Sequence, residues 1–303
     1  MSGPKRSFWR DYLPVVILLL GLAAALTWSL TMHLGGSPEI DALTGSLLLV
    51  TGFAAGLLGG LIGTGGCSIM LPVIHFWFGY SVPIAVGTTL FAVIFTTLSG
   101  AYGHLIRKNL DKTLFLWIGV MGTIGVIVGS WVFTLLVSQV ALLNFILGLA
   151  FIFPAIRMII EGVGKTQAKK AQGEGGQAKI SKPLTSLFGF VIGILTGIAG
   201  LGGGYALVPG LIYLFDTPVY ITMGTSLASM IPLATIGGGI KLAQGYVALN
   251  TGLILGIGTV IGAQLGAAII KRFKPNTLKL IFGIYFFYVA LKFITSYFGI
   301  QIF

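Results

Sequence analysis

Long apolar segments separated by short polar loops make up almost the whole chain. Nine runs of mostly hydrophobic residues approach or exceed the roughly 20 residues that cross the hydrocarbon core of a bilayer as a helix. They cover residues 12–33, 43–62, 83–103, 113–136, 140–160, 184–200, 219–240, 247–270 and 278–298. Because a helix satisfies its own backbone hydrogen bonds in lipid, the pattern predicts a polytopic bundle of membrane helices rather than a β-barrel.

The composition agrees with this class, since 56% of the residues are hydrophobic and 8% are charged, against roughly 25% charged in soluble domains. The first run follows Lys5, Arg6 and Arg10, as a secretory signal would, but it exceeds the roughly 7–15 apolar residues of such a signal. We therefore expect a retained N-terminal helix. The single cysteine, Cys67, excludes an internal disulfide and a site built from several thiolates, and we expect no cofactor.

Basic residues gather at the N-terminus and at residues 107–112, 157–182 and 271–279. These clusters hold 16 of the 18 Lys and Arg residues, so the positive-inside rule puts all of them on the cytoplasmic side of a bacterial inner membrane. The N-terminus is then cytoplasmic and the C-terminus outside. Topology accounts for the net charge of +11, and we expect the lipid bilayer rather than nucleic acid as a partner. Residues 161–183, rich in Gly, Lys and Gln, are predicted to form a flexible cytoplasmic linker.

The basic clusters also restrict the number of crossings, because clusters on one side of the membrane must be joined by an even number of them. The runs at 12–33 and 83–103 already supply two crossings between the N-terminus and Arg107. The segment between these runs must therefore leave and return on the same side. It is predicted to do so as a pair of helices or half-helices at 43–62 and 67–78.

A shift of 137 positions aligns two halves of the chain, placing GFAAGLLGGLIGTGGCSIMLP (52–72) on GFVIGILTGIAGLGGGYALVP (189–209). The alignment continues without a gap through GTTL at 87–90 and GTSL at 224–227. The chain is therefore predicted to contain two copies of a unit of five helical elements. The predicted divisions are an N-terminal segment with an extra helix (1–42), a first repeat (43–160), the linker (161–183) and a second repeat (184–303).

The second copy is expected to be inverted, because an odd number of crossings separates it from the first. Basic residues follow the third element of the first copy, at 107–112, but the fourth element of the second copy, at 271–274. Positive-inside orientation of an inverted repeat requires this exchange of ends. The predicted fold is thus an all-α polytopic membrane protein of two inverted repeats with glycine-broken helices, plus one extra N-terminal helix.

Each copy contains a break at which neighbouring glycines interrupt the helix, at 63–67 and 200–204. The short helices predicted to start at Cys67 and Gly204 would point unpaired amides and positive dipole ends at these breaks, which favours an anion. We expect an anion site built from the breaks and from nearby hydroxyls. Its predicted residues are Gly65, Gly66, Cys67, Ser68, Thr88, Thr89, Gly202, Gly203, Gly204, Tyr205, Thr225 and Ser226.

Two further features have alternative interpretations. His104 and Lys241 occupy aligned positions at the end of the third element of each copy. Each is expected to be either an electrostatic guide or gate, or a helix-end anchor that extends to the membrane interface. The helically spaced glycines, such as Gly52, Gly56 and Gly60, are expected to allow close helix packing rather than to bind a ligand.

The acidic residues narrow the class of substrate. All seven carboxylates lie in loops or near the ends of apolar runs. None is therefore placed for a buried sodium or proton site or for a cationic substrate, and a small anion is the expected substrate. The sequence also lacks a cluster of His, Cys, Asp and Glu residues, which argues against a membrane enzyme.

The paired motifs GLIGTGGCSIMLP (60–72) and GIAGLGGGYALVP (197–209), each followed by GTTL or GTSL, resemble the TauE/SafE sulfite exporter family, as does HLIRKNLD at 104–111. This family is also called the toluene sulfonate uptake permease family, and the resemblance covers residues 43–298. It implies transport of small sulfur-containing anions such as sulfite, sulfoacetate and other organosulfonates. Cys67 replaces the third glycine of the first motif and Lys241 stands in place of a histidine, so the identity of the anion stays open.

The expected function is export of such an anion by alternating access, in which the two breaks form one site and one repeat rocks against the other. A membrane potential that is negative inside drives a monoanion outward, so export needs no coupled ion. Two alternatives stay open: an anion channel with the same amide-lined path, and an importer of sulfur oxyanions or organosulfonates. Import would need a proton or another gradient, with His104 as the first residue to test. The sequence leaves the oligomeric state open.

Overall fold

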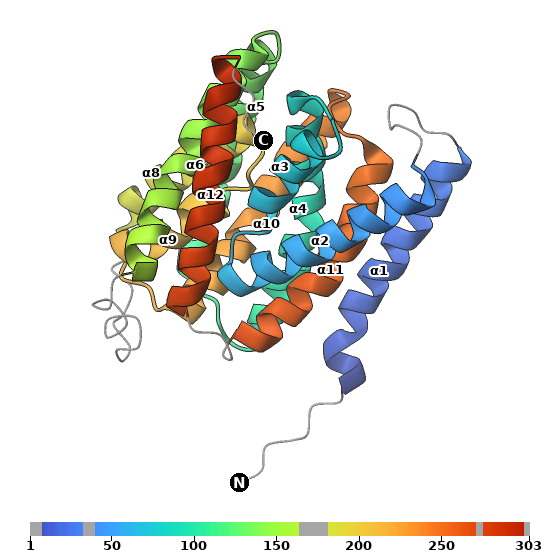
Figure 1. Ribbon diagram of the computed structural model, residues 1–303. Helices are drawn as coiled ribbons and strands as arrows, with labels where there is room; N and C mark the ends of the chain where they lie inside the picture. Colours follow the sequence, from blue (N-terminus) through green and yellow to red (C-terminus); the bar gives the residue numbers. More distant parts are fainter. Residues whose placement is uncertain (1–7, 33–39, 164–180, 271–274, 300–303) are drawn as a thin grey trace.

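A computed structural model describes residues 8–32, 40–163, 181–270 and 275–299 of the chain. Within these residues it contains eleven helices and no strand (Figure 1). The helices are α1 (Phe8–Thr31), α2 (Ala42–Ile62), α3 (Cys67–Phe76), α4 (Val82–Leu105), α5 (Lys112–Leu136), α6 (Val140–Val163), α8 (Lys182–Ala199), α9 (Gly204–Leu214), α10 (Val219–Ala243), α11 (Leu249–Ile269) and α12 (Pro275–Tyr297). As far as they are described, eight of them are long and apolar enough to cross a membrane, whereas α3 and α9 are short.

The apolar runs of the sequence all form helices, with ends within a few residues of the predicted ones. The short helices α3 and α9 begin at Cys67 and Gly204, as predicted. Carboxylate caps explain two of the other starts, because Asp41 and Asp111 precede α2 and α5 and accept hydrogen bonds from backbone N–H groups of their first turns. The predicted linker falls mainly on residues 164–180, which lie outside the described residues, as does the predicted basic segment at 271–274.

Three helix pairs pack most extensively, α2 with α11, α5 with α8 and α6 with α12. Two residues that lie 137 positions apart are termed matched. A Cβ atom added at Gly56 on α2 would lie 2.6 Å from the Thr259 Cα, and one added at the matched Gly193 on α8 would lie 2.9 Å from the Gly122 Cα. Thr259 and Gly122 are themselves matched. Backbones this close leave no room for a side chain, which confirms the predicted packing role of the helically spaced glycines.

The helices α4 and α10 form the centre of the bundle. They contact each other, α4 also packs on α11, and α10 packs on α5. Figure 1 shows α1 at one edge of the bundle and α6, α8 and α12 at the other. The short helices α3 and α9 contact α4 and α10, respectively, so the helix breaks that precede them face the centre.

Candidate functional site

The two helix breaks are shaped by glycines in the left-handed region of backbone conformation. Positive φ angles occur at three glycines of each break: Gly63, Gly65 and Gly66, and Gly200, Gly202 and Gly203. Gly66 and Gly203 precede the first residues of α3 and α9, with φ of 73° and 82°. Since residues with a Cβ atom seldom adopt such angles, the glycines explain why α2 and α8 stop here and a new helix starts in another direction.

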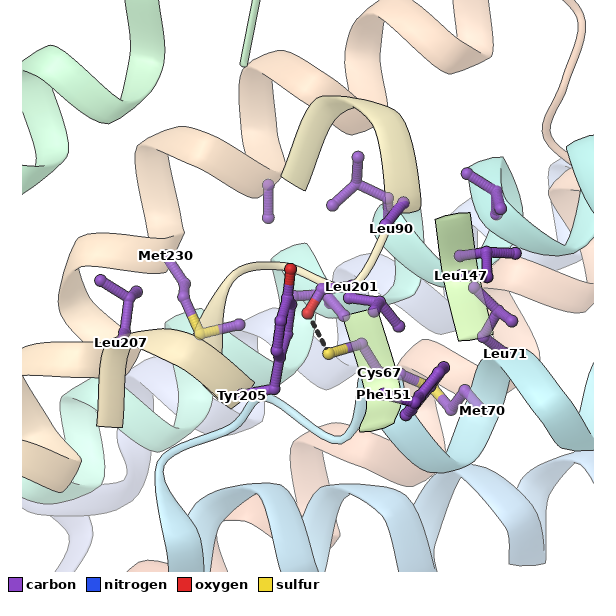
Figure 2. Close-up of a cluster of buried hydrophobic side chains, with 14 of the residues drawn as sticks. Cys67, Met70, Leu71, Leu90, Leu147, Phe151, Leu201, Tyr205, Leu207 and Met230 are labelled. Atoms are coloured by element: carbon purple, nitrogen blue, oxygen red, sulfur yellow. Dashed lines mark hydrogen bonds between the residues drawn. The ribbon is translucent and has the colours of Figure 1, made fainter. Parts of the chain in front are cut away.

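The two breaks touch each other, although they lie far apart in the sequence. The thiol of Cys67 donates a hydrogen bond to the Leu201 carbonyl of the other break, and Figure 2 shows this contact beside the Tyr205 ring. The second break also contacts the first, because a Cβ atom added at Gly204 would lie 2.5 Å from the Thr64 Cα. The predicted break residues therefore come together at one place between α3 and α9.

The side chain of Met230 fills the space between the breaks. Its Cε atom lies 2.6 Å from the position that a Cβ atom would take at Gly65, and 2.6 Å from the same position at Gly202. The Val93 Cγ1 atom lies 3.4 Å and 3.1 Å from those two positions. Val93 and Met230 are matched, and no motif marks them. The signal that identifies them is their spacing, because each lies one helical turn beyond a GTTL or GTSL motif and so shares its helix face.

Several backbone amides at the breaks have no backbone acceptor. Within the described residues, no acceptor is recorded for the N–H groups that run from Gly65 to Ser68, nor for those from Gly202 to Tyr205. These groups include the first amides of α3 and α9, helices of 10 and 11 residues whose positive dipole ends point toward the breaks. Such an arrangement favours a small anion.

The hydroxyls of the GTTL and GTSL motifs divide into two kinds. Thr88 and Thr225, which are matched, accept hydrogen bonds of 2.9 Å from the N–H groups of Ala248 and Asp111 and so hold the starts of α11 and α5. Ser226 donates to the Gly63 carbonyl of the first break at 2.8 Å. Its matched residue Thr89 is fully buried, yet its hydroxyl has no partner in the described part of the chain.

Further buried hydroxyls lie at the second break. The side chains of Tyr205 and Thr196 are 5% and 0% exposed, and neither hydroxyl has a partner among the described residues. The Thr196 Oγ1 atom lies 2.8 Å from the position of a Cβ atom at Gly203, at the start of α9. Ser68, the residue matched to Tyr205, is also buried. Buried polar groups without partners are costly in a protein interior, so these hydroxyls are candidates for contact with a ligand.

His104 and Lys241 are fully buried and lie at the ends of α4 and α10. The Nε2–H of His104 donates to the Gly60 carbonyl on α2 at 3.0 Å. The ammonium of Lys241 stands 3.2 Å from the centre of the Phe133 ring and has no hydrogen-bond partner among the described residues. Both side chains therefore point into the bundle, which disfavours the interpretation of Lys241 as an anchor that extends to the interface.

A cavity of about 80 Å³ connects the breaks with one end of the bundle. It follows one face of α9, from Tyr205 and the nearby Thr64 to a charged cluster formed by Arg157, Glu161 and Tyr213. The sequence pattern gave no sign of this cluster, because Arg157 and Glu161 were expected only to form the edge of a basic cytoplasmic segment.

Residues matched to part of the cavity lining are more deeply buried. Val219 and Tyr220 line the cavity at the start of α10, where Tyr220 is 42% exposed. The matched residues on α4, Val82 and Pro83, are buried. The starts of α4 and α10 therefore differ in the burial of matched residues.

The unequal bonding of Ser226 and Thr89 makes a prediction about stability. Ser226→Ala is expected to lower the free energy of unfolding by about 1 kcal/mol, because the buried Gly63 carbonyl loses its donor. Thr89→Val removes a hydroxyl without a partner among the described residues and is expected to leave stability unchanged or higher. Thermal unfolding of the purified variants in detergent measures the difference. Equal losses in both variants would contradict the bonding pattern.

The chain is similar to known membrane transporter proteins. The family model described as "Sulfite exporter TauE/SafE" matches residues 48–293. Similar proteins include the probable membrane transporter protein YdhB of Bacillus subtilis, 27% identical over 77% of this chain and 93% of its own length. The probable membrane transporter protein MJ0441 of Methanocaldococcus jannaschii is 28% identical over 77% of this chain and 89% of its own length. No solved structure gives a significant match.

Proposed function

Because this chain belongs to the TauE/SafE sulfite exporter family, we propose that it is a secondary transporter that exports small sulfur-containing anions across the bacterial inner membrane. Sulfite, sulfoacetate and other organosulfonates form the proposed substrate class. The observation that carries the proposal is the meeting of two glycine breaks at one place, with unpaired amides and buried hydroxyls around them. The positive-inside rule puts the N-terminus in the cytoplasm and the C-terminus outside.

The two halves are proposed to be inverted repeats that move against each other. This proposal is supported by contacts that recur at matched positions, such as Thr88 with Ala248 and Thr225 with Asp111. It is also supported by the matched pair Val93 and Met230, which lies against both breaks. A twofold relation in the membrane plane brings equivalent residues to one central site, as in other transporters built from inverted repeats.

The anion is proposed to bind where the breaks meet. Its oxygens would accept hydrogen bonds from the amides that precede α3 and α9 and from the hydroxyls of Ser68, Thr89 and Tyr205. Ser226 would act indirectly, because its single O–H donates to the Gly63 carbonyl and so holds the first break. Thr88 and Thr225 would act indirectly, by holding the starts of α11 and α5. His104 and Lys241 would lie at the two ends of the path, where positive charge or a proton can guide the anion. Met230 fills the space between the two breaks, so its side chain must move when the anion enters.

The present conformation corresponds to the state open to the cytoplasm in this scheme. The cavity lies beside α9 and the start of α10, at the end of the bundle that the basic clusters assign to the cytoplasm. Rocking of one repeat against the other would close this cavity and open the matched surface near Val82 and Pro83.

The proposed export predicts that the membrane potential changes the rate of anion efflux. In proteoliposomes with a potential that is negative inside, efflux of a monoanion is expected to accelerate. The equilibrium ratio should approach about 50-fold at 100 mV, because one charge gains roughly 2.3 kcal/mol. Sulfite efflux is measured with and without an imposed potassium diffusion potential and with no pH gradient. Efflux that does not change with the potential would exclude electrogenic export. In a separate measurement with a pH gradient and no potential, accelerated sulfite uptake would favour a proton-coupled importer. Efflux that unlabelled sulfite outside does not stimulate would favour a channel.

A further inference from the structure

A charged cluster lines the end of the cavity that we assign to the cytoplasm. Arg157 and Glu161 lie one turn apart on α6, and the Arg157 Nε donates to the Glu161 Oε1 at 3.1 Å. The Tyr213 hydroxyl, from α9, donates to the same oxygen. The Arg157 guanidinium also lies over the Tyr213 ring, 3.5 Å from its centre. The cluster thus joins α6 to the short helix that starts at the second break.

The two charges of this cluster differ in their accessibility. The Glu161 side chain is 10% exposed, and Arg157 and Tyr213 cover its carboxylate. The Arg157 side chain is 38% exposed; its Nε donates to Glu161, and its guanidinium also contacts the Tyr213 side chain. A guanidinium carries five N–H donors, so these contacts leave donors of Arg157 for a ligand in the cavity that it lines. A guanidinium matches the spacing of two oxygens on one sulfur or carbon atom.

The location of Arg157 ties it to the path of the anion. It lines the cavity that reaches Thr64 and Tyr205 at the breaks, and it also lines a larger cavity of about 560 Å³ between α6, α8 and α9. Of the described residues that line either cavity, Arg157 is the one basic residue. An isolated i, i+4 pair on a helix contributes little stability, so stability alone does not account for Arg157 at this place in the cavity lining.

We propose that Arg157 is the cytoplasmic entry site for the anion, an inference that rests on the proposed function. Its guanidinium binds two oxygens of a sulfite or sulfonate group before the anion moves along α9 to the breaks. The Tyr213 ring holds the plane of the guanidinium, and Glu161 is the counter-ion that the entering anion displaces. Removal of Glu161 therefore strengthens binding, whereas removal of Arg157 weakens it.

Transport kinetics measured from each face of the membrane test this assignment. Sulfite transport by the full-length protein is recorded in proteoliposomes of known orientation, from the cytoplasmic and from the outer face. Arg157→Gln is expected to raise the half-saturating concentration at the cytoplasmic face about tenfold, through the loss of hydrogen bonds from a charged group, with no change at the outer face. Glu161→Gln is expected to lower the same concentration about threefold, because the competing charge is gone. Arg157→Lys keeps the positive charge but lacks the planar guanidinium. Its half-saturating concentration at the cytoplasmic face is expected to lie between those of Arg157→Gln and the unmodified protein.

The control is Lys182→Gln, which removes an exposed basic side chain at the start of α8, next to Trp117. It is expected to leave both half-saturating concentrations unchanged. A merely structural ion pair would make Arg157→Gln and Glu161→Gln shift in the same direction, or not at all, and either result would overturn the inference while leaving the proposed function intact. Absence of sulfite or sulfonate flux in the unmodified protein would overturn the proposed function and this inference with it.

Discussion

Replacing Gly203 with alanine is expected to lower sulfite transport by a factor on the order of 100 while the protein still folds, because small displacements of groups that hold a reacting or bound molecule have effects of this size. Gly203 has φ of 82° and precedes the first residue of α9. An added Cβ atom would lie 2.7 Å from the Ile192 Cγ2 and 2.8 Å from the Thr196 Oγ1. Both neighbours belong to side chains that can shift, so the substitution moves the first amides of α9 and the Thr196 hydroxyl rather than preventing folding.

Gly245 provides the control position for this substitution. It lies in the loop after α10, has φ of 78°, and has no atom within 4 Å of an added Cβ atom. Gly245→Ala therefore carries the same backbone strain, about 1–2 kcal/mol, without touching the breaks. Sulfite flux in proteoliposomes and thermal unfolding in detergent are measured for both variants. If Gly203→Ala transports as fast as Gly245→Ala, the breaks are not the binding site.

Lys241→Met is expected to raise stability and lower transport at the same time. The ammonium is fully buried against Phe133, with no hydrogen-bond partner among the described residues, so an apolar side chain of similar length should stabilise the protein by about 1–3 kcal/mol. Transport should fall at least about tenfold, since a positive charge in a medium of low dielectric constant attracts an anion strongly. If Lys241 had only a structural role, its replacement would not raise stability and lower transport at the same time.

Lys292→Met is the control for Lys241, because the charge distribution puts these two lysines on the same outer side. Lys292 lies near the Phe76 ring, 4.6 Å from its centre, and its side chain is not buried. Its replacement is expected to change neither transport nor the melting temperature appreciably. Parallel losses of flux in the two variants would indicate a general effect of outer surface charge and would remove Lys241 from the path.

Much of the architecture could be predicted from the sequence. Apolar runs predicted the helices, and neighbouring glycines predicted that α3 and α9 start at Cys67 and Gly204. The helical spacing of Gly52, Gly56 and Gly60 predicted close helix packing, and the structure shows that the partner is α11. These features depend on the chain itself, because the length of an apolar run, the conformational freedom of glycine and the absence of a side chain act locally.

The roles of individual polar groups could not be predicted in the same way. Thr88 and Thr89 are neighbours in one motif, yet Thr88 bonds to the start of α11 and Thr89 has no partner among the described residues. Ser226, matched to Thr89, bonds to the first break instead. One helical residue advances the side-chain direction by roughly 100°, so adjacent hydroxyls meet different helices, and which helix each meets depends on how helices distant in sequence cross.

The sequence by itself determined that this is a helical membrane protein with two aligned glycine breaks and a strong charge bias, because hydrophobicity, glycine content and charge are properties of short segments. Only the tertiary structure decided that the breaks touch through Cys67 and Leu201, that Met230 fills the space between them, and that Arg157 stands at the end of the cavity. These contacts join residues that are distant in the sequence, such as Cys67 and Leu201, which lie 134 positions apart. Their partners are selected by the packing of whole helices, which no local pattern encodes.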